Sequence, residues 1–174
     1  MKIGLFGAVL GAATLAASFG FGEAQTVGGG GKEARYTLTI RAKQPEYKVG
    51  TPILIEVMVK NVSTSGLEGL GMEESAADLF FTAEVRDDKG VSVPETQFER
   101  DVRAGEALWV GGSSAPVGGP PWLLQPGKSR TLKIDLIRRF DLSQPGRYVV
   151  QVQRQNDKSA AKVKSNQITI TIAN

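Results

Sequence analysis

The sequence has 174 residues and a formal net charge of +3 at pH 7, and it contains neither histidine nor cysteine. Without these residue types, a Ser-His-Asp triad, a Cys-His pair, disulfide bonds and the common zinc sites are excluded. A chain of this length is expected to form one domain with extensions.

The N-terminal segment has the pattern of a secretory signal peptide. Lys2 is followed by no charged residue until Glu23, and small residues surround Ala24. This pattern predicts a signal peptide over residues 1–24 and an exported protein, periplasmic or extracellular. Residues 3–22 are also long enough to span a bilayer, so an uncleaved anchor is the alternative. After cleavage we expect no integral membrane segment.

Residues 25–35 are polar and include four consecutive glycines, which predicts a flexible linker.

From residue 36 onward the apolar residues repeat every second position, which is typical of half-buried strands. Segments with this alternation are residues 36–41, 53–62, 79–86, 129–136, 148–153 and 167–172. Residues 87–90 predict a turn, with residues 91–93 returning antiparallel. No helical periodicity is found beyond the signal segment.

Seven or so short strands separated by turn residues predict an all-β fold, an immunoglobulin-like antiparallel sandwich with long loops over residues 36–173. The segment "FDLSQPGRYVVQV" supports this prediction. In such a sandwich the chain changes sheets before its sixth strand. Leu142 can pack beneath that crossing, Pro145 and Gly146 can form the turn, and Tyr148 can return its hydroxyl to upstream backbone, the tyrosine corner.

Acidic residues gather in two predicted loops. Glu73, Glu74 and Asp78 lie in one, and Asp87 and Asp88 in the other. Carboxylates of this kind can bind calcium, but no spacing matches an EF-hand, and acidic loop residues are usually just solvated. We therefore predict no catalytic residues, no metal site and no cofactor.

The segment 105–127 is rich in glycine and proline and contains both tryptophans of the chain. Exposed Trp109 and Trp122 would suit a protein partner or a sugar ring. The alternative is that both rings cap an open end of the core. Arg138 and Arg139 are further candidates for binding an acidic partner, with a solvated turn as the alternative.

The runs "YKVGTPILIEVMVKNVS", "LLQPGKSRTLKIDLIRRFDLSQPGRYVVQV" and "VKSNQITITI" resemble bacterial exported immunoglobulin-like domains of uncharacterised type. They are also similar to the β-sandwich prodomain of deuterolysin-like metalloproteases and to the fold of small bacterial intracellular proteinase inhibitors. The resemblance covers most of residues 36–172. It implies the fold, while no inhibitory loop motif and no zinc-binding histidine of those families has a counterpart here.

These patterns favour a non-enzymatic, exported binding module that contacts another protein or a cell-envelope component through its loops. Nucleic acid is not expected as a partner, because the basic residues do not alternate with aromatic ones on one face. The alternatives are a proteinase inhibitor or protease-associated module, suggested by the resemblance, and a hydrolase that uses carboxylates such as Glu74 and Asp78 alone.

Overall fold

The computed structural model describes residues 34–67, 79–104, 123–154 and 163–174. The predicted signal peptide and most of the predicted linker lie outside these residues. The elements, in chain order, are β1 (Tyr36–Ala42), β2 (Glu46–Lys48), β3 (Leu54–Asn61), β4 (Phe81–Asp87), α1 (Gln97–Ala104), β5 (Ser129–Asp135), the 3-10 helix η3 (Leu136–Arg138), β6 (Gly146–Arg154) and β7 (Ile168–Ala173). In the described part of the chain, no helix has the length and apolarity needed to cross a membrane.

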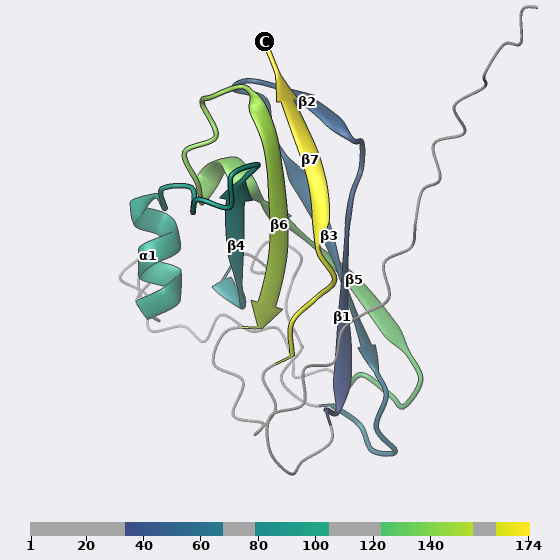
Figure 1. The fold of residues 1–174 in the computed structure, drawn as a ribbon. Coiled ribbons are helices and arrows are strands. Elements are labelled where there is room, and N and C mark those ends of the chain that lie inside the picture. Colours follow the sequence, from purple (N-terminus) through teal and green to yellow (C-terminus); the bar gives the residue numbers. More distant parts are fainter. Residues whose placement is uncertain (1–33, 68–78, 105–122, 155–162) are drawn as a thin grey trace, which may run out of the picture.

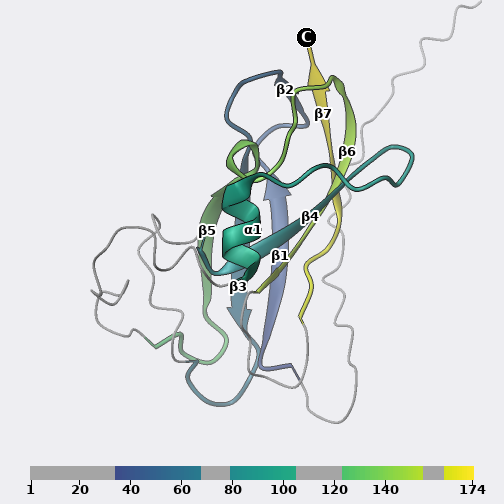
Figure 2. The same ribbon diagram turned by 90° about the vertical axis from the view of Figure 1, so that its left-hand side faces the viewer.

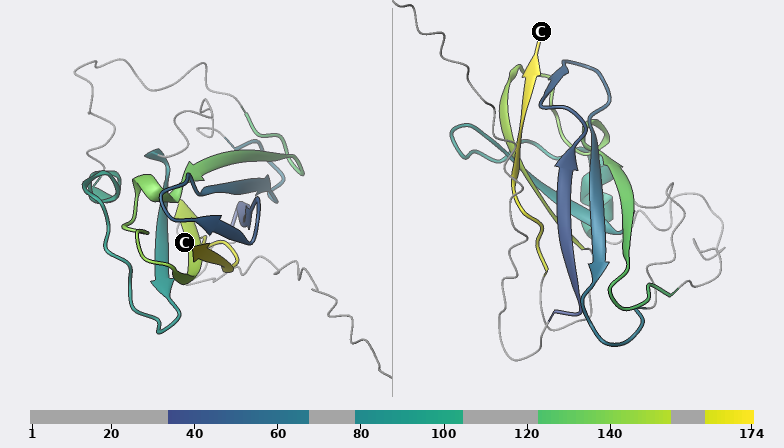
Figure 3. Two further views of the ribbon diagram at one scale, coloured as in Figure 1. Left: turned by 90° about the horizontal axis from the view of Figure 1, so that it is seen from above. Right: turned by 90° about the vertical axis from the view of Figure 1, so that its right-hand side faces the viewer.

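The strands form two sheets that face each other (Figures 1 and 3). Sheet A has the order β1-β3-β5, and sheet B has the order β2-β7-β6-β4. In immunoglobulin terms these are strands A-B-E and A′-G-F-C, so the predicted immunoglobulin-like sandwich is confirmed. The pairs are antiparallel except that β2 runs parallel to β7, which makes sheet B mixed.

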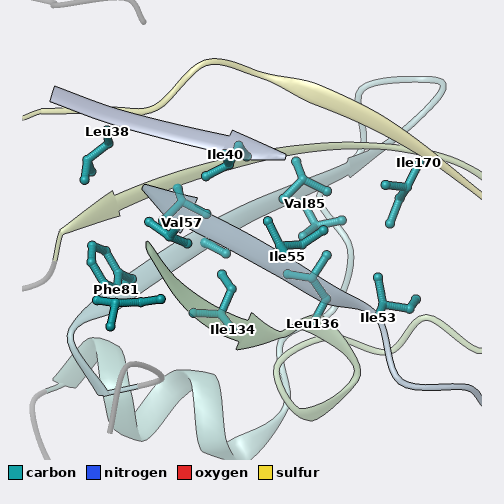
Figure 4. Close-up of a cluster of buried hydrophobic side chains, with 14 of the residues drawn as sticks. Leu38, Ile40, Ile53, Ile55, Val57, Phe81, Val85, Ile134, Leu136 and Ile170 are labelled. Atoms are coloured by element: carbon teal, nitrogen blue, oxygen red, sulfur yellow. The ribbon is translucent and has the colours of Figure 1, made fainter. Parts of the chain in front are cut away.

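The core lies between the two sheets because each strand turns alternate apolar side chains inward. Along β6, for example, Tyr148, Val150 and Val152 are buried, as the alternation predicts. Figure 4 shows side chains from both sheets meeting in this layer, among them Leu38, Ile55 and Ile134 from sheet A and Phe81, Val85 and Ile170 from sheet B. Burying such a side chain fully stabilises the fold by about 1.5–3 kcal/mol.

The crossing between β5 and β6 is the tyrosine corner that the sequence predicts. The Tyr148 hydroxyl donates a hydrogen bond of 2.6 Å to the carbonyl oxygen of Gln144, four residues upstream. Leu142 is buried beneath the crossing, whereas Pro145 is exposed and Gly146 is half-buried. Burial, with the nearby carboxylates of Asp87 and Asp141, raises the pKa of the Tyr148 phenol above 10.0.

Four local features differ from the predictions. A helix, α1, stands between β4 and β5, where the sequence showed no helical periodicity. Strand β2 lies between the predicted strands 36–41 and 53–62, where no alternation predicts a strand, and Leu136 starts η3 instead of ending a strand. The predicted antiparallel return at residues 91–93 is limited to one bridge, between Arg86 and Ser92, with bonds from the Asp87 amide to the Val91 carbonyl at 2.9 Å and from the Val93 amide to the Val85 carbonyl at 3.0 Å.

Candidate functional site

The long connections of the domain leave and rejoin the described strands at one end of the sandwich, which we call the loop end. They are residues 62–80, 105–128 and 155–167, which follow β3, α1 and β6. The register shows that their neighbouring strand ends lie together, because Tyr36 pairs with Asn61 in sheet A and Phe81 pairs with Arg154 in sheet B. The Arg154 guanidinium lies 5.7 Å from the centre of the Tyr36 ring, which places both sheet ends side by side.

The opposite end, which we call the turn end, is closed by short connections and the tyrosine corner. The Thr51 amide bonds to the Lys48 carbonyl at 3.1 Å, and the Gly90 amide bonds to the Asp87 carbonyl at 3.0 Å. Gly90 has a φ of 80°, which L side chains rarely adopt. The Asp87 carboxylate accepts bonds from the amides of Lys89 and Val91 and so fixes the hairpin.

Asn61 holds two of the long connections to the sandwich at the loop end. Its buried side-chain amide donates to the carbonyls of Ser65 and Leu124, at 2.9 and 2.7 Å, and its oxygen accepts from Ser63. Leu67 and Leu124 are both buried and exchange backbone bonds of 3.0 and 3.1 Å. The connection after β3 therefore begins, and the connection before β5 ends, at a fixed point.

The third connection is held where it returns to β7. The Ser165 amide donates to the Val152 carbonyl at 2.8 Å, and the Ser165 hydroxyl accepts from the Val152 amide at 2.9 Å. Lys164 pairs with Glu84 on the outer side of β4 at 3.1 Å. A rigid scaffold with fixed loop roots is the arrangement on which binding loops are commonly built.

The tryptophan candidates lie outside the described residues, so the choice between binding residue and core cap stays a prediction. The position at which their connection rejoins the domain is nevertheless defined. Trp122 precedes Leu123, which is 45% exposed, and Leu124, which is anchored to Leu67. The segment that carries both tryptophans thus returns to the sandwich at the loop end.

Arg139 differs from both sequence interpretations, because it is neither at the surface nor solvated. The side chain is fully buried, and its Nη1 donates to Glu99 Oε2 at 2.5 Å and to the Phe81 carbonyl at 2.8 Å. Arg138 is exposed, and its guanidinium lies 4.4 Å from the centre of the Phe98 ring. The structure therefore separates the two neighbouring arginines, and only Arg138 faces solvent.

The sequence reasoning missed Glu99, the buried partner of Arg139. Burial raises the pKa of the Glu99 carboxyl above 4.5, while Arg139, the Ala83 amide and Arg103 oppose that rise. The signal for this residue was the pattern Thr-x-x-Glu at Thr96 and Glu99, which is common at helix starts. The Thr96 hydroxyl accepts from the Glu99 amide at 3.4 Å and so caps α1.

The acidic candidates are divided between described and undescribed segments. Glu73, Glu74 and Asp78 lie outside the described residues, so calcium binding or acid-base chemistry by them is untested. Within residues 34–67, 79–104, 123–154 and 163–174, no group of three or more acidic side chains is placed to hold a metal ion.

No protein-family model and no curated protein matches this sequence. Among solved structures, the chain is similar to the CARDB domain of a Pyrococcus furiosus protein in complex with di-metal ions, at 12% identity and a TM-score of 0.40, over 79% of this chain and 87% of that chain. It is also similar to a β-glucosidase from Erythrobacter marinus, at 14% identity and a TM-score of 0.41, over 79% of this chain but 15% of the enzyme. A DNA glycosylase of Pseudomonas fluorescens matches at 9% identity and a TM-score of 0.41, over 81% of this chain and 31% of the glycosylase. These likenesses are too distant to bear on function.

Proposed function

We propose that this chain is an exported, non-enzymatic binding module that contacts another protein or a cell-envelope component through its loop end. One observation carries the proposal. The three long connections share one end of the sandwich, and their roots are fixed by Asn61, Leu124 and Ser165, while the other end has short turns. The connections after β3 and β6 occupy the positions of the B–C and F–G loops, with which antibody variable domains bind antigens.

The partner class follows from the sequence. Trp109 and Trp122 belong to the connection that rejoins the sandwich at Leu124, and large aromatic side chains dominate the binding energy of many protein interfaces. The resemblance to exported immunoglobulin-like domains favours a partner in the cell envelope. The weaker resemblance to proteinase inhibitors makes a protease the alternative partner.

The main experiment is recovery of a partner from envelope fractions or culture supernatant with the tagged domain. We expect a Trp109→Ala, Trp122→Ala double variant to lose recovery at an unchanged melting temperature. Val91→Ala is the matched control, because Val91 is 60% exposed at the turn end, and it should retain the partner. Loss of recovery with Val91→Ala alone would contradict a loop-end site.

A second measurement locates the interface even if the tryptophan variants unfold. A photocrosslinker attached at Lys60 or Lys128, both exposed at the loop end, should capture the partner, and one at the exposed Lys89 of the turn end should not. Capture through Lys89 alone would overturn the proposal. A captured protease whose activity falls on titration with the domain would support the alternative.

A further inference from the structure

Basic residues gather at the loop end. Its described residues are 34–37, 59–67, 79–82, 123–131, 152–154 and 163–167, and none of them is acidic. Six of them are basic, namely Arg35, Lys60, Lys128, Arg130, Arg154 and Lys164. At the turn end, the described residues 43–52, 86–92, 141–147 and 172–174 include five basic residues (Lys43, Lys48, Arg86, Lys89 and Arg147) and four acidic ones (Glu46, Asp87, Asp88 and Asp141). Charge is therefore balanced at the turn end but not in the described part of the loop end.

Three of the cations are exposed on neighbouring strand ends of sheet A. They are Arg35, Lys60 and Lys128. The Val62 amide donates to the Arg35 carbonyl at 3.0 Å, and the Asn61 amide donates to the Lys128 carbonyl at 2.9 Å. Lys60 directly precedes Asn61, so the three cations lie within two residues of one another across β1, β3 and β5. Figure 2 shows β3 running away from the C-terminus toward this end of the molecule.

Two exposed apolar side chains lie beside these cations. Val62 is 49% exposed and Leu123 is 45% exposed. Their backbones are close together, because the side chain of Asn61 donates to the Leu124 carbonyl at 2.7 Å. Binding at a membrane interface uses the same two contributions, which are the burial of apolar area and the attraction of cations to anionic lipids.

The chain also enters the domain at the loop end. β1 begins there, because Tyr36 pairs with Asn61 at the end of β3. The apolar segment 3–22, which is long enough to span a bilayer, is joined to β1 through residues 25–35. Eleven residues reach at most about 40 Å when fully extended. A membrane that holds the apolar segment, before or without cleavage, is therefore within reach of the loop end.

We propose that the loop end binds the surface of an anionic lipid bilayer. Arg35, Lys60 and Lys128 meet the anionic headgroups, while Val62 and Leu123 enter the boundary between headgroups and acyl chains. This inference rests on the proposed function and narrows its partner to the lipid of the cell envelope. The charge favours an anionic partner, and the exposed apolar pair and the entry of the chain favour a bilayer over a soluble polyanion.

The main test measures how much of the mature chain, residues 25–174, sediments with lipid vesicles. We expect binding to vesicles of equal parts phosphatidylglycerol and phosphatidylcholine, and binding at least about tenfold weaker to phosphatidylcholine alone. Binding should be lost in about 1 M NaCl, where the Debye length falls to about 3 Å.

Paired lysine variants locate the charge that matters. Lys60→Gln with Lys128→Gln should weaken binding to the anionic vesicles about twenty-five-fold, because each cation near an anionic surface contributes about fivefold. The matched control is Lys48→Gln with Lys89→Gln, both exposed at the turn end, which has the same net charge and should bind as the unaltered chain does. Equal weakening by the two pairs would overturn the proposal, since net charge alone would then explain the binding.

A fluorescent label reports which end touches the bilayer. The chain has no cysteine, so a polarity-sensitive fluorophore can be attached at a single introduced one. With Thr64→Cys at the loop end, emission should shift to the blue on anionic vesicles, and with Val91→Cys at the turn end it should not, although both positions are exposed. A shift with Val91→Cys alone would contradict both this proposal and a loop-end site.

Absent binding to the anionic vesicles would overturn the lipid proposal by itself. Glu68, Glu73, Glu74 and Asp78, which the sequence places in the connection after β3, remain in every variant, so neutralisation of the loop end by them would give this result. If the tagged domain still recovered a protein through its loop end, the proposed function would stand and its partner would be that protein.

Discussion

β1 and β4 are edge strands whose outward backbone amide and carbonyl groups are bonded by side chains. The side chains are neutral at β1 and charged at β4. On β1, the neutral side-chain amide of Asn166 bonds to both backbone groups of Ile40, accepting from its amide at 2.7 Å and donating to its carbonyl at 3.1 Å. On β4, the carboxylate of Glu99 and the guanidinium groups of Arg103 and Arg139 do the equivalent work. Both Asn166 and Glu99 are buried.

We call the side chains that bond these outward backbone groups the β1 cap (Asn166) and the β4 cap (Glu99, Arg103 and Arg139). The two caps differ in the charge that they bury. An amide copies a peptide group, so Asn166 satisfies Ile40 without bringing a charge into the interior and without titrating. The β4 cap brings two full charges out of water, and it is stable only while both partners are present. The β1 cap also comes from the segment before β7 and so ties sheet A to sheet B, whereas α1 covers only the edge of its own sheet.

Arg139→Met should be the largest disturbance. It leaves Glu99 buried without its main partner and removes the donor to the Phe81 carbonyl. We expect the free energy of unfolding, measured by urea denaturation at pH 7, to fall by about 3–5 kcal/mol. A Glu99→Gln, Arg139→Met double variant should recover part of the loss, because no unpaired charge remains. Equal losses in both variants would contradict the interpretation that the unpaired carboxylate of Glu99 causes the loss of stability.

Asn166→Ala should rank second. It leaves the amide and carbonyl of Ile40 without partners in a buried position, where each costs about 1–3 kcal/mol. We expect a total loss of about 2–3 kcal/mol by the same denaturation measurement. The exposed neighbour Gln167 supplies the control, and Gln167→Ala should change stability by less than about 0.5 kcal/mol. If Asn166→Ala also lost less than about 0.5 kcal/mol, the bonds from Asn166 to Ile40 would not be needed for stability.

The pH dependence of the free energy of unfolding should differ between the two caps. Because the pKa of Glu99 is raised in the folded protein, folding takes up protons at this site in the window above 4.5. Its contribution to stability is therefore complete below pH 4.5 and is lost as the pH rises through the folded pKa. The stability difference between the protein and Glu99→Gln should fall across this window, by at most about 1.4 kcal/mol per pH unit. The corresponding difference for Asn166→Ala should stay flat.

Arg41→Ala should have the smallest effect on the free energy of unfolding. It tests whether the contribution of the β4 cap to stability depends on its burial and not only on its charge. Arg41 pairs with Glu56 across β1 and β3, but its side chain is 75% exposed. Exposed pairs contribute little because water and salt screen them. We expect a loss below about 0.5 kcal/mol, and denaturation in 1 M NaCl should remove even that. A loss comparable to that of Arg139→Met would contradict the role assigned to burial.

The strands that one could predict are those whose side chains alternate between core and water. β1, β3, β4, β5, β6 and β7 each have several inward apolar residues, so a period of two identifies them, and the Tyr148 corner follows from its Pro-Gly turn. β2 has only three residues, with Pro45 before it, and its single inward side chain gives no period. Its pairing depends on residues 171–173, which no local pattern reveals.

The edge cap was harder to predict than the strands because its buried residues are charged. Helix α1 buries Glu99 and Val102, so it lacks the apolar stripe by which helices are usually identified. Arg139 has the composition of a surface residue, and its burial is explained only by Glu99, which lies 40 residues earlier in the chain. The loop end follows from the topology, while the tryptophan hypothesis depends on residues that the structure does not describe.

The parallel contact between β2 and β7 has a consequence for how the domain folds. It joins residues 46–48 to residues 171–173, with further bonds from the Thr171 amide to Pro45 and from the Val49 amide to Ala173. Sheet A needs only residues up to 135, but sheet B closes only when the last strand arrives. Contacts this distant in sequence slow folding. Sheet B can therefore form completely only after its final strand has been synthesised.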